Sequence, residues 1–134
     1  MTYQTLLHRI NEDLSNNPEL LRACKEVLDE VNSKPKNNFR HVTYSKFAEI
    51  SGSHLDREDV ASLTRYLCGD RVKLFNLNFE YIDADTDANF ILDEENSRSV
   101  VKENAIAHPL TGELIENASK NVFVFFSMND QVNF

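Results

Sequence analysis

Three aspartates at alternate positions form the most distinctive chemical pattern in this sequence. Asp83, Asp85 and Asp87 are followed by Glu94, which places acids at positions 1, 3, 5 and 12 of an EF-hand-like calcium loop. Three features oppose calcium binding. Position 6, where the loop needs glycine, is Ala88, and the preceding residues alternate as a strand rather than an entering helix. The sequence also has no second loop of this kind to pair with the first. An acidic hairpin turn is therefore favoured, and a calcium-binding module is the second alternative.

Basic and hydroxyl side chains form a second pattern, which suits nucleic acid. Residues 34–46 contain no acid, and residues 57–65 follow on a predicted helix. The candidate contacts to DNA are Lys34, Lys36, Arg40, Lys46, Arg57, Ser62 and Arg65. Asp56, Glu58 and Asp59 oppose this use, because they precede or begin the same helix, where a recognition helix usually meets DNA. A DNA-binding regulator is thus the first alternative.

The other reactive side chains form no catalytic pattern. The four histidines are scattered without metal-ligand spacing, and the three glycines do not form a phosphate-binding loop. Cys24 and Cys68 lie on apolar faces of predicted helices, as buried thiols of a reducing compartment do. We therefore expect neither an enzyme nor a cofactor.

Negative charge is concentrated in the second half of the chain. Residues 1–75 carry eleven acids and eleven bases, whereas residues 76–134 carry eleven acids and three bases, giving the whole chain a net charge of −8. Such a field repels nucleic acid and favours a protein partner with a basic surface.

Local signals predict a pair of short helices at the centre of the chain. Thr43 can cap a helix over residues 44–51, which Gly52 ends. Asp56 can cap a second helix over residues 57–68, with Asp59 at its third position, and Gly69 ends it. Two short helices joined by residues 52–55 are typical of a helix-turn-helix.

Strand signals surround this helix pair. Residues 39–42 are expected to form a short strand, and residues 72–81 alternate between apolar and polar types. The alternation breaks once, which predicts a bulge near Phe75. Residues 83–88 form the acidic turn and residues 89–93 return, so that this hairpin would be a wing.

The two ends of the chain add helices and one further strand. Helices are predicted over residues 3–15 and 18–33, the latter capped by Asn17, and Ser97 begins another that ends before His108. Residues 121–128 form a strand that is apolar on both faces. We expect Phe123 and Phe125 on an exposed face of this strand, beside the acidic turn, as a protein-docking surface.

Together these elements predict one α+β domain over residues 1–134. N-terminal helices occupy residues 1–33, a winged helix-turn-helix core occupies residues 39–93, and a helix-turn-strand extension occupies residues 94–134. In element order, residues 18–93 resemble a winged-helix domain. That resemblance is one of architecture and implies no single function.

The C-terminal part carries a second resemblance. The segment 108–113, with the sequence His-Pro-Leu-Thr-Gly-Glu, and the terminal aromatic strand resemble the small middle subunits of bacterial ABC-ATPase three-component conflict systems. This resemblance implies a non-catalytic adaptor in antiviral defence, whose larger partner is an ATPase or a nuclease. Neither a membrane-spanning run nor a signal peptide is recognised, which predicts a cytoplasmic protein.

Overall fold

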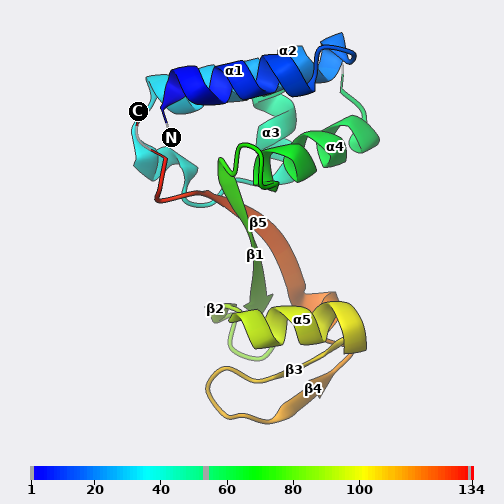
Figure 1. Ribbon diagram of the computed structural model, residues 1–134. Coiled ribbons are helices and arrows are strands. Elements are labelled where there is room, and N and C mark those ends of the chain that lie inside the picture. Colours follow the sequence, from blue (N-terminus) through cyan, green and yellow to red (C-terminus); the bar gives the residue numbers. More distant parts are fainter. Residues whose placement is uncertain (1, 53–54, 133) are drawn as a thin grey trace. The chain divides into compact units, whose positions relative to one another are not determined.

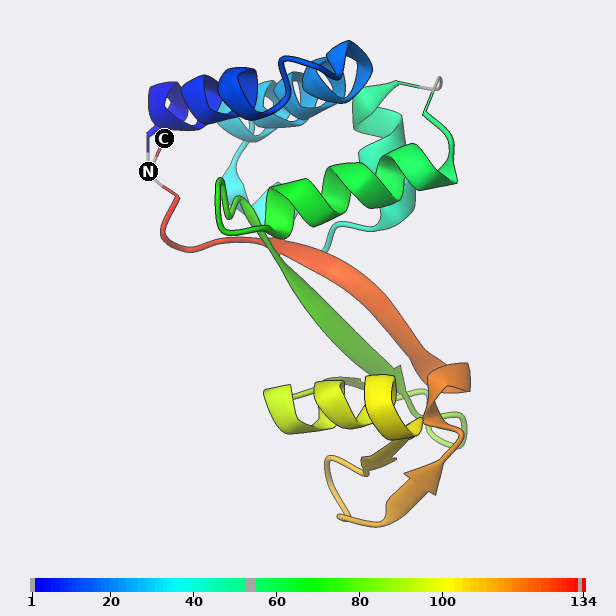
Figure 2. The ribbon, with the colours of Figure 1, turned by 45° about the vertical axis from the view of Figure 1, so that its right-hand side comes forward.

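The computed structural model describes residues 2–52, 55–132 and 134, and its fold class is α+β, as predicted (Figure 1). The chain divides into two compact units. Unit 1 comprises residues 1–76 and 126–134, and unit 2 comprises residues 77–125. Strands β1 (Phe75–Ile82) and β5 (Val122–Met128) carry the chain between them, and they are neighbours in one sheet (Figure 2). The boundary lies within β1, so the hairpin predicted as a wing belongs to unit 2.

Unit 1 is built from helices whose ends follow the local signals. Its helices are α1 (Tyr3–Asp13), α2 (Pro18–Ser33), α3 (Tyr44–Ser51) and α4 (Arg57–Cys68). The side chains of Asn17, Thr43 and Asp56 accept hydrogen bonds from first-turn amides, and Asp56 and Asp59 form a capping box. The predicted helices over residues 18–33, 44–51 and 57–68 are confirmed.

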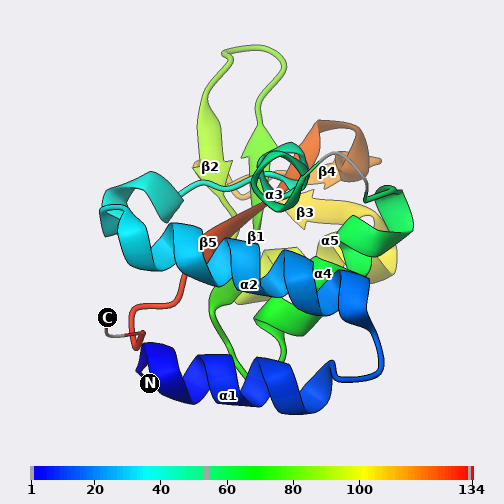
Figure 3. The same cartoon turned by 90° about the horizontal axis from the view of Figure 1, so that it is seen from above.

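Helix α2 is central to unit 1, because it packs against α1, α3 and α4. Figure 3 shows α1 and α2 as neighbouring antiparallel helices. Phe47 of α3 is fully buried, and its ring meets Phe75 and Phe126 edge-on at centroid distances of 5.0 and 5.3 Å. The two ends of unit 1 also meet, since Tyr3 and Phe134 are 5.9 Å apart between ring centroids.

Unit 2 contains a sheet covered on one face. The strand order is β2-β1-β5, and β2 (Asn89–Ile91) pairs antiparallel with β1. Helix α5 (Glu94–Glu103), a hairpin of β3 (Ala105–Ala107) and β4 (Leu114–Glu116), and the short 3-10 helix η2 (Ala118–Asn121) complete the unit. Its core consists of Tyr81, Leu92, Val100, Ile106 and Ala118, packed against Phe79, Phe90, Ile115 and Val122.

Two strand predictions near the helix pair are wrong in detail. Residues 36–39 form a 3-10 helix, η1 (Lys36–Phe39), closed by a hydrogen bond from Asn38 N–H to the Pro35 carbonyl. Only Val42 pairs with a strand, in a single bridge to Phe126. Strand β1 begins at Phe75 rather than at residue 72, because a turn with Lys73 at a φ of 42° precedes it. The predicted break in the alternation thus lies beside the start of β1, where this turn ends.

The predicted helix after the hairpin is displaced. Asp93 caps α5 by accepting from Asn96 N–H, so the helix begins before Ser97. It ends at Asn104, which adopts a left-handed conformation, and residues 105–107 become β3 instead of helix. The turn at residues 108–113 is confirmed as the loop of the β3–β4 hairpin, with Gly112 at a φ of 72°. No helix of the described residues could cross a membrane.

Candidate functional site

The acidic segment forms the tip of the β1–β2 hairpin. Asp83 N–H donates to the Ala88 carbonyl at 2.9 Å, and Asp87 N–H donates to the Asp83 carbonyl at 2.8 Å. The Asp83 carboxylate also accepts from Asp85 N–H at 2.9 Å. Asp87, at position 5 of the EF-hand-like pattern, adopts a positive φ of 59°. Ala88, at position 6, therefore does not need the left-handed conformation. The turn therefore satisfies its own backbone and has strands on both sides.

Asp83 has a second partner, His108, from the β3–β4 loop. The Nε2 atom of His108 lies 2.9 Å from the Asp83 carboxylate, and both side chains are largely buried. Nδ1 of His108 accepts from the amides of Leu110 and Thr111 at 3.1 and 3.4 Å. Nε2 must therefore carry the proton that is donated to Asp83. This hydrogen bond, followed by that from Asp85, holds the pKa of Asp83 below its ordinary value.

The calcium pattern is not assembled as in an EF-hand. The Asp83 carboxylate is engaged by His108 and by a backbone amide. Asp85 and Asp87 are exposed at the tip, and Glu94 is the first residue of α5. Within residues 2–52, 55–132 and 134, no group of three or more His, Cys, Asp or Glu side chains could hold a metal ion.

The face of the sheet opposite the unit 2 core carries exposed apolar residues. Ile91 lies directly opposite Glu80 across the β1–β2 pair, one residue out of step with the core pair of Tyr81 and Phe90. Val122 packs on the core, so the next residue, Phe123, lies on the opposite face. Ile91 is 68% exposed and Phe123 is 51% exposed. We call this the outer sheet face.

Phe125 corrects part of the predicted docking surface. It alternates onto the same face of β5 as Phe123, yet it is only 5% exposed. The adjacent Phe126 is 2% exposed and meets Tyr44 and Phe47 of α3 edge-on. The outer face of β5 is thus half exposed at Phe123 and buried at Phe125. Of these two residues, only Phe123 is available to contact a protein partner.

Most of the predicted nucleic-acid contacts are engaged within unit 1. Lys34 pairs with Glu30, Lys36 donates to the Val132 carbonyl at 2.8 Å, and Lys46 lies 3.7 Å from Glu49. Two candidates bind each other, since Arg65 donates to the Ser62 hydroxyl at 3.3 Å. Arg40 and Arg57 are exposed. Carboxylates therefore pair with Lys34 and Lys46 of the basic run, whereas Lys36 binds a neutral carbonyl.

A shallow apolar groove lies between α3 and α4. It encloses about 420 Å³, and its lining residues are Tyr44, Ser45, Ala48, Leu55, Asp56, Arg57, Val60 and Ala61. An apolar lining fits a hydrocarbon side chain better than a phosphate. Leu55 of the predicted turn lines this groove, whereas the turn residues Ser53 and His54 lie outside the described part of the chain.

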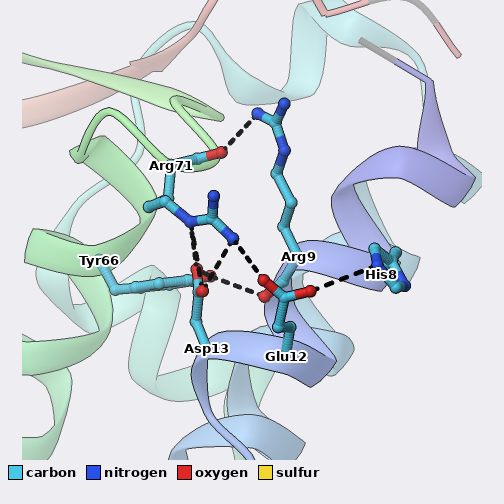
Figure 4. Close-up of polar contacts among 6 residues, drawn as sticks. All are labelled: His8, Arg9, Glu12, Asp13, Tyr66 and Arg71. Carbon is cyan, nitrogen blue, oxygen red and sulfur yellow. Dashed lines mark hydrogen bonds and ion pairs between the residues drawn. The ribbon is translucent and has the colours of Figure 1, made fainter.

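A polar cluster joins α1 to the segment that follows α4 (Figure 4). Arg71 donates to both carboxylate oxygens of Asp13 at 2.9 and 3.0 Å, and the Tyr66 hydroxyl donates to Asp13 at 2.7 Å. Glu12 lies 3.2 Å from Arg71, and Arg9 donates to the Arg71 carbonyl at 2.8 Å. Arg71 and then Tyr66 lower the pKa of Asp13. The cluster fastens α1 and was not predicted from the sequence.

The two cysteines are not activated nucleophiles. Burial raises the pKa of the Cys24 thiol to about 12 and that of Cys68 to about 11. The thiolate, which is the reactive form, is therefore scarce at neutral pH.

Three kinds of comparison found no known protein that is similar to this chain. No family model, no curated protein and no solved structure matches it. Its function must be inferred from the surfaces described above.

Proposed function

We propose that this protein is a non-catalytic adaptor or accessory subunit that binds a larger protein partner through unit 2. The supporting observation is the distribution of exposed apolar side chains. Eight large apolar residues are markedly exposed in the described chain, and six of them belong to unit 2, which has fewer residues than unit 1. These six are Leu77, Ile91, Val101, Leu110, Leu114 and Phe123. Apolar side chains concentrated in this way favour a protein interface.

The charge of unit 2 indicates the character of that partner. Residues 77–125 contain ten acids and three bases, a net charge of −7, which leaves −1 for unit 1. A partner that presents apolar anchors within a basic surface would be attracted and oriented by this field. The outer sheet face, with Ile91 and Phe123 beside the acidic tip of Asp83, Asp85 and Asp87, is the docking surface in this proposal.

The class of partner rests on the resemblance of the C-terminal segment to the middle subunits of three-component conflict systems. That resemblance favours an ATPase or a nuclease in a bacterial defence complex. The β3–β4 loop, whose segment 108–113 carries the resemblance, lies in unit 2 with the exposed residues.

Affinity purification of the tagged protein at native expression level tests the proposal. The wild-type chain should retain a larger protein in stoichiometric amount, and Phe123→Asp should reduce its recovery at least tenfold. Asn11→Asp, which adds the same charge to exposed α1 of unit 1, is the matched control and should retain the partner. Absence of a stoichiometric partner from the wild-type protein would refute the adaptor function.

A DNA-binding regulator is the second candidate. It is favoured by the exposure of Arg57 and Arg65 on α4, the second helix of the predicted helix-turn-helix. Fluorescence anisotropy against a pool of genomic DNA fragments distinguishes the two functions. We expect weak binding without sequence preference that falls steeply with salt. Nanomolar, sequence-specific binding that is lost in Arg57→Ala and Arg65→Ala would make the regulator the correct function.

A further inference from the structure

Strand β5 leaves one of its backbone edges open in unit 2. The sheet order β2-β1-β5 places β5 at the end of the sheet, with β1 on one side only. On the other side, the described residues supply a single bridge, between Val42 and Phe126 of unit 1. Residues 122–125 of β5 therefore continue beyond that bridge as an edge strand within unit 2.

The hydrogen bonds of the bridge identify which groups face this edge. Phe126 N–H donates to the Val42 carbonyl, and Val42 N–H donates to the Phe126 carbonyl, both at 2.7 Å. Backbone groups of a strand point alternately to its two sides, so the N–H and carbonyl of Val124 point to the same side as those of Phe126. Val122 also has this direction, but its N–H is used by the Ser119 carbonyl of η2. Val124 thus presents the donor and acceptor of an open ladder position.

The side chains around Val124 suit a second strand. Phe123 is half exposed on the outer sheet face, while Val122 and Val124 are partly buried on the core face. An added strand would extend both faces, and its own apolar residues could cover Phe123. Unpaired, apolar edge strands are the usual templates for such pairing, which natural chains otherwise block with charges or proline.

Charge selects between the possible occupants. A second copy of the chain would bring two units of net charge −7 together, which opposes β5–β5 pairing. A basic segment from another protein would be attracted instead. We infer that the β5 edge at Val124 receives an extended segment of the partner, alternating apolar and basic residues, which adds as a strand to the sheet. This inference deepens the proposed function and rests on it.

Amide hydrogen exchange on the isotope-labelled full chain tests the added strand. The probe is a ten-residue peptide that alternates valine and lysine, and the control peptide has glutamate in place of lysine. In the free protein, Val124 N–H should exchange quickly, whereas Phe126 N–H, bonded to Val42, should exchange slowly. The valine–lysine peptide should slow exchange at Val124 at least tenfold, and the valine–glutamate peptide should have no effect.

Proline substitutions supply a matched pair of variants. Val124→Pro removes the outward N–H of β5, and proline is tolerated where an edge N–H faces solvent. Asn89→Pro is the control on the other edge strand. Asp83 N–H of the β1 side donates to the Ala88 carbonyl, so the Asn89 N–H that follows points away from β1. Peptide binding measured by anisotropy should fall at least tenfold in Val124→Pro and remain in Asn89→Pro.

The results separate the added strand from the adaptor function. Peptide binding without protection of Val124, equal binding of both peptides, or no binding would overturn the strand inference. If Val124→Pro fails to fold, the exchange rates of the wild-type chain decide. A partner recovered by affinity purification that leaves Val124 N–H unprotected would uphold the adaptor and refute the added strand. Peptide-induced protection of Val124 N–H with no partner recovered would uphold the added strand and refute the adaptor.

Discussion

The Asp83 carboxylate and the His108 imidazole lie 2.9 Å apart and join the tips of two hairpins in unit 2. This contact ties the acidic turn to the loop of the β3–β4 hairpin. Tyr81 and Phe90 meet the His108 ring edge-on at 5.9 and 5.5 Å, which fixes its orientation. The ionised carboxylate of Asp83 therefore stabilises the fold of unit 2.

Stability in acid should depend on Asp83. Its folded pKa lies below the ordinary value of 3.8, so its ionised form stabilises the fold fully above that value. The contribution is lost as pH falls through the lowered folded pKa. Denaturant midpoints of the wild type and Asp83→Asn should therefore differ at pH 6 and approach each other as the pH falls through the lowered folded pKa. Asp85→Asn, the same change at an exposed position, should leave the midpoint almost unaltered across this pH range.

The aromatic cluster of unit 1 should dominate its stability. Phe47 is fully buried between Phe75 and Phe126, so Phe47→Ala should cost about 3–5 kcal/mol of unfolding free energy. Ile91→Ala removes a side chain that is 68% exposed, and it should change that free energy by less than about 0.5 kcal/mol. Urea denaturation followed by circular dichroism measures both. Equal losses in the two variants would contradict the assigned core.

The cluster around Asp13 should hold α1 in place. Tyr66→Phe keeps the ring and removes the hydroxyl that donates to Asp13 at 2.7 Å, which should cost about 1 kcal/mol. Faster amide exchange in α1, with α3 unaffected, would locate the effect. Tyr44→Phe is a matched control, because it removes the hydroxyl of a tyrosine in α3 that is 45% exposed and lies outside the cluster. Unchanged exchange in α1 of Tyr66→Phe would show that the cluster does not fasten that helix.

Calcium affinity should be no tighter than millimolar. The Asp83 carboxylate is engaged by His108, and the tip lacks the helical flanks and paired loop of an EF-hand. Isothermal titration calorimetry with calcium chloride measures this directly. Micromolar binding that disappears in Asp83→Ala would overturn the assignment of the segment as a hairpin turn.

Local interactions made most of the helices predictable. The caps at Asn17, Thr43 and Asp56 lie within three residues of the amides that they accept from, so sequence spacing alone reveals them. The same logic missed the start of α5, because Asp93 and Ser97 are both good capping residues and only the fold selects Asp93. The strand at residues 122–128 was predictable from its apolar run.

Contacts between distant residues were beyond such reasoning. Arg71 and Asp13 are 58 residues apart, and His108 and Asp83 are 25 residues apart, and no pattern of spacing pairs them. Phe125 is 5% exposed although Phe123, on the same face of β5, is 51% exposed, and periodicity does not encode such a change along one strand. The exposure of Phe123 was predicted correctly, whereas that of Phe125 was not.

Unit 1 is built from two separate stretches of the chain, residues 1–76 and 126–134, and this affects when it can complete its fold during synthesis. Unit 2 is continuous in sequence, so its residues 77–125 can collapse together once they leave the ribosome. Unit 1 needs Phe126 beside Val42 and Asn129 N–H bonded to the Leu74 carbonyl, and both residues are translated after unit 2. Until residues 126–129 are available, the four N-terminal helices lack these contacts, and the Phe47 ring lacks its neighbour Phe126.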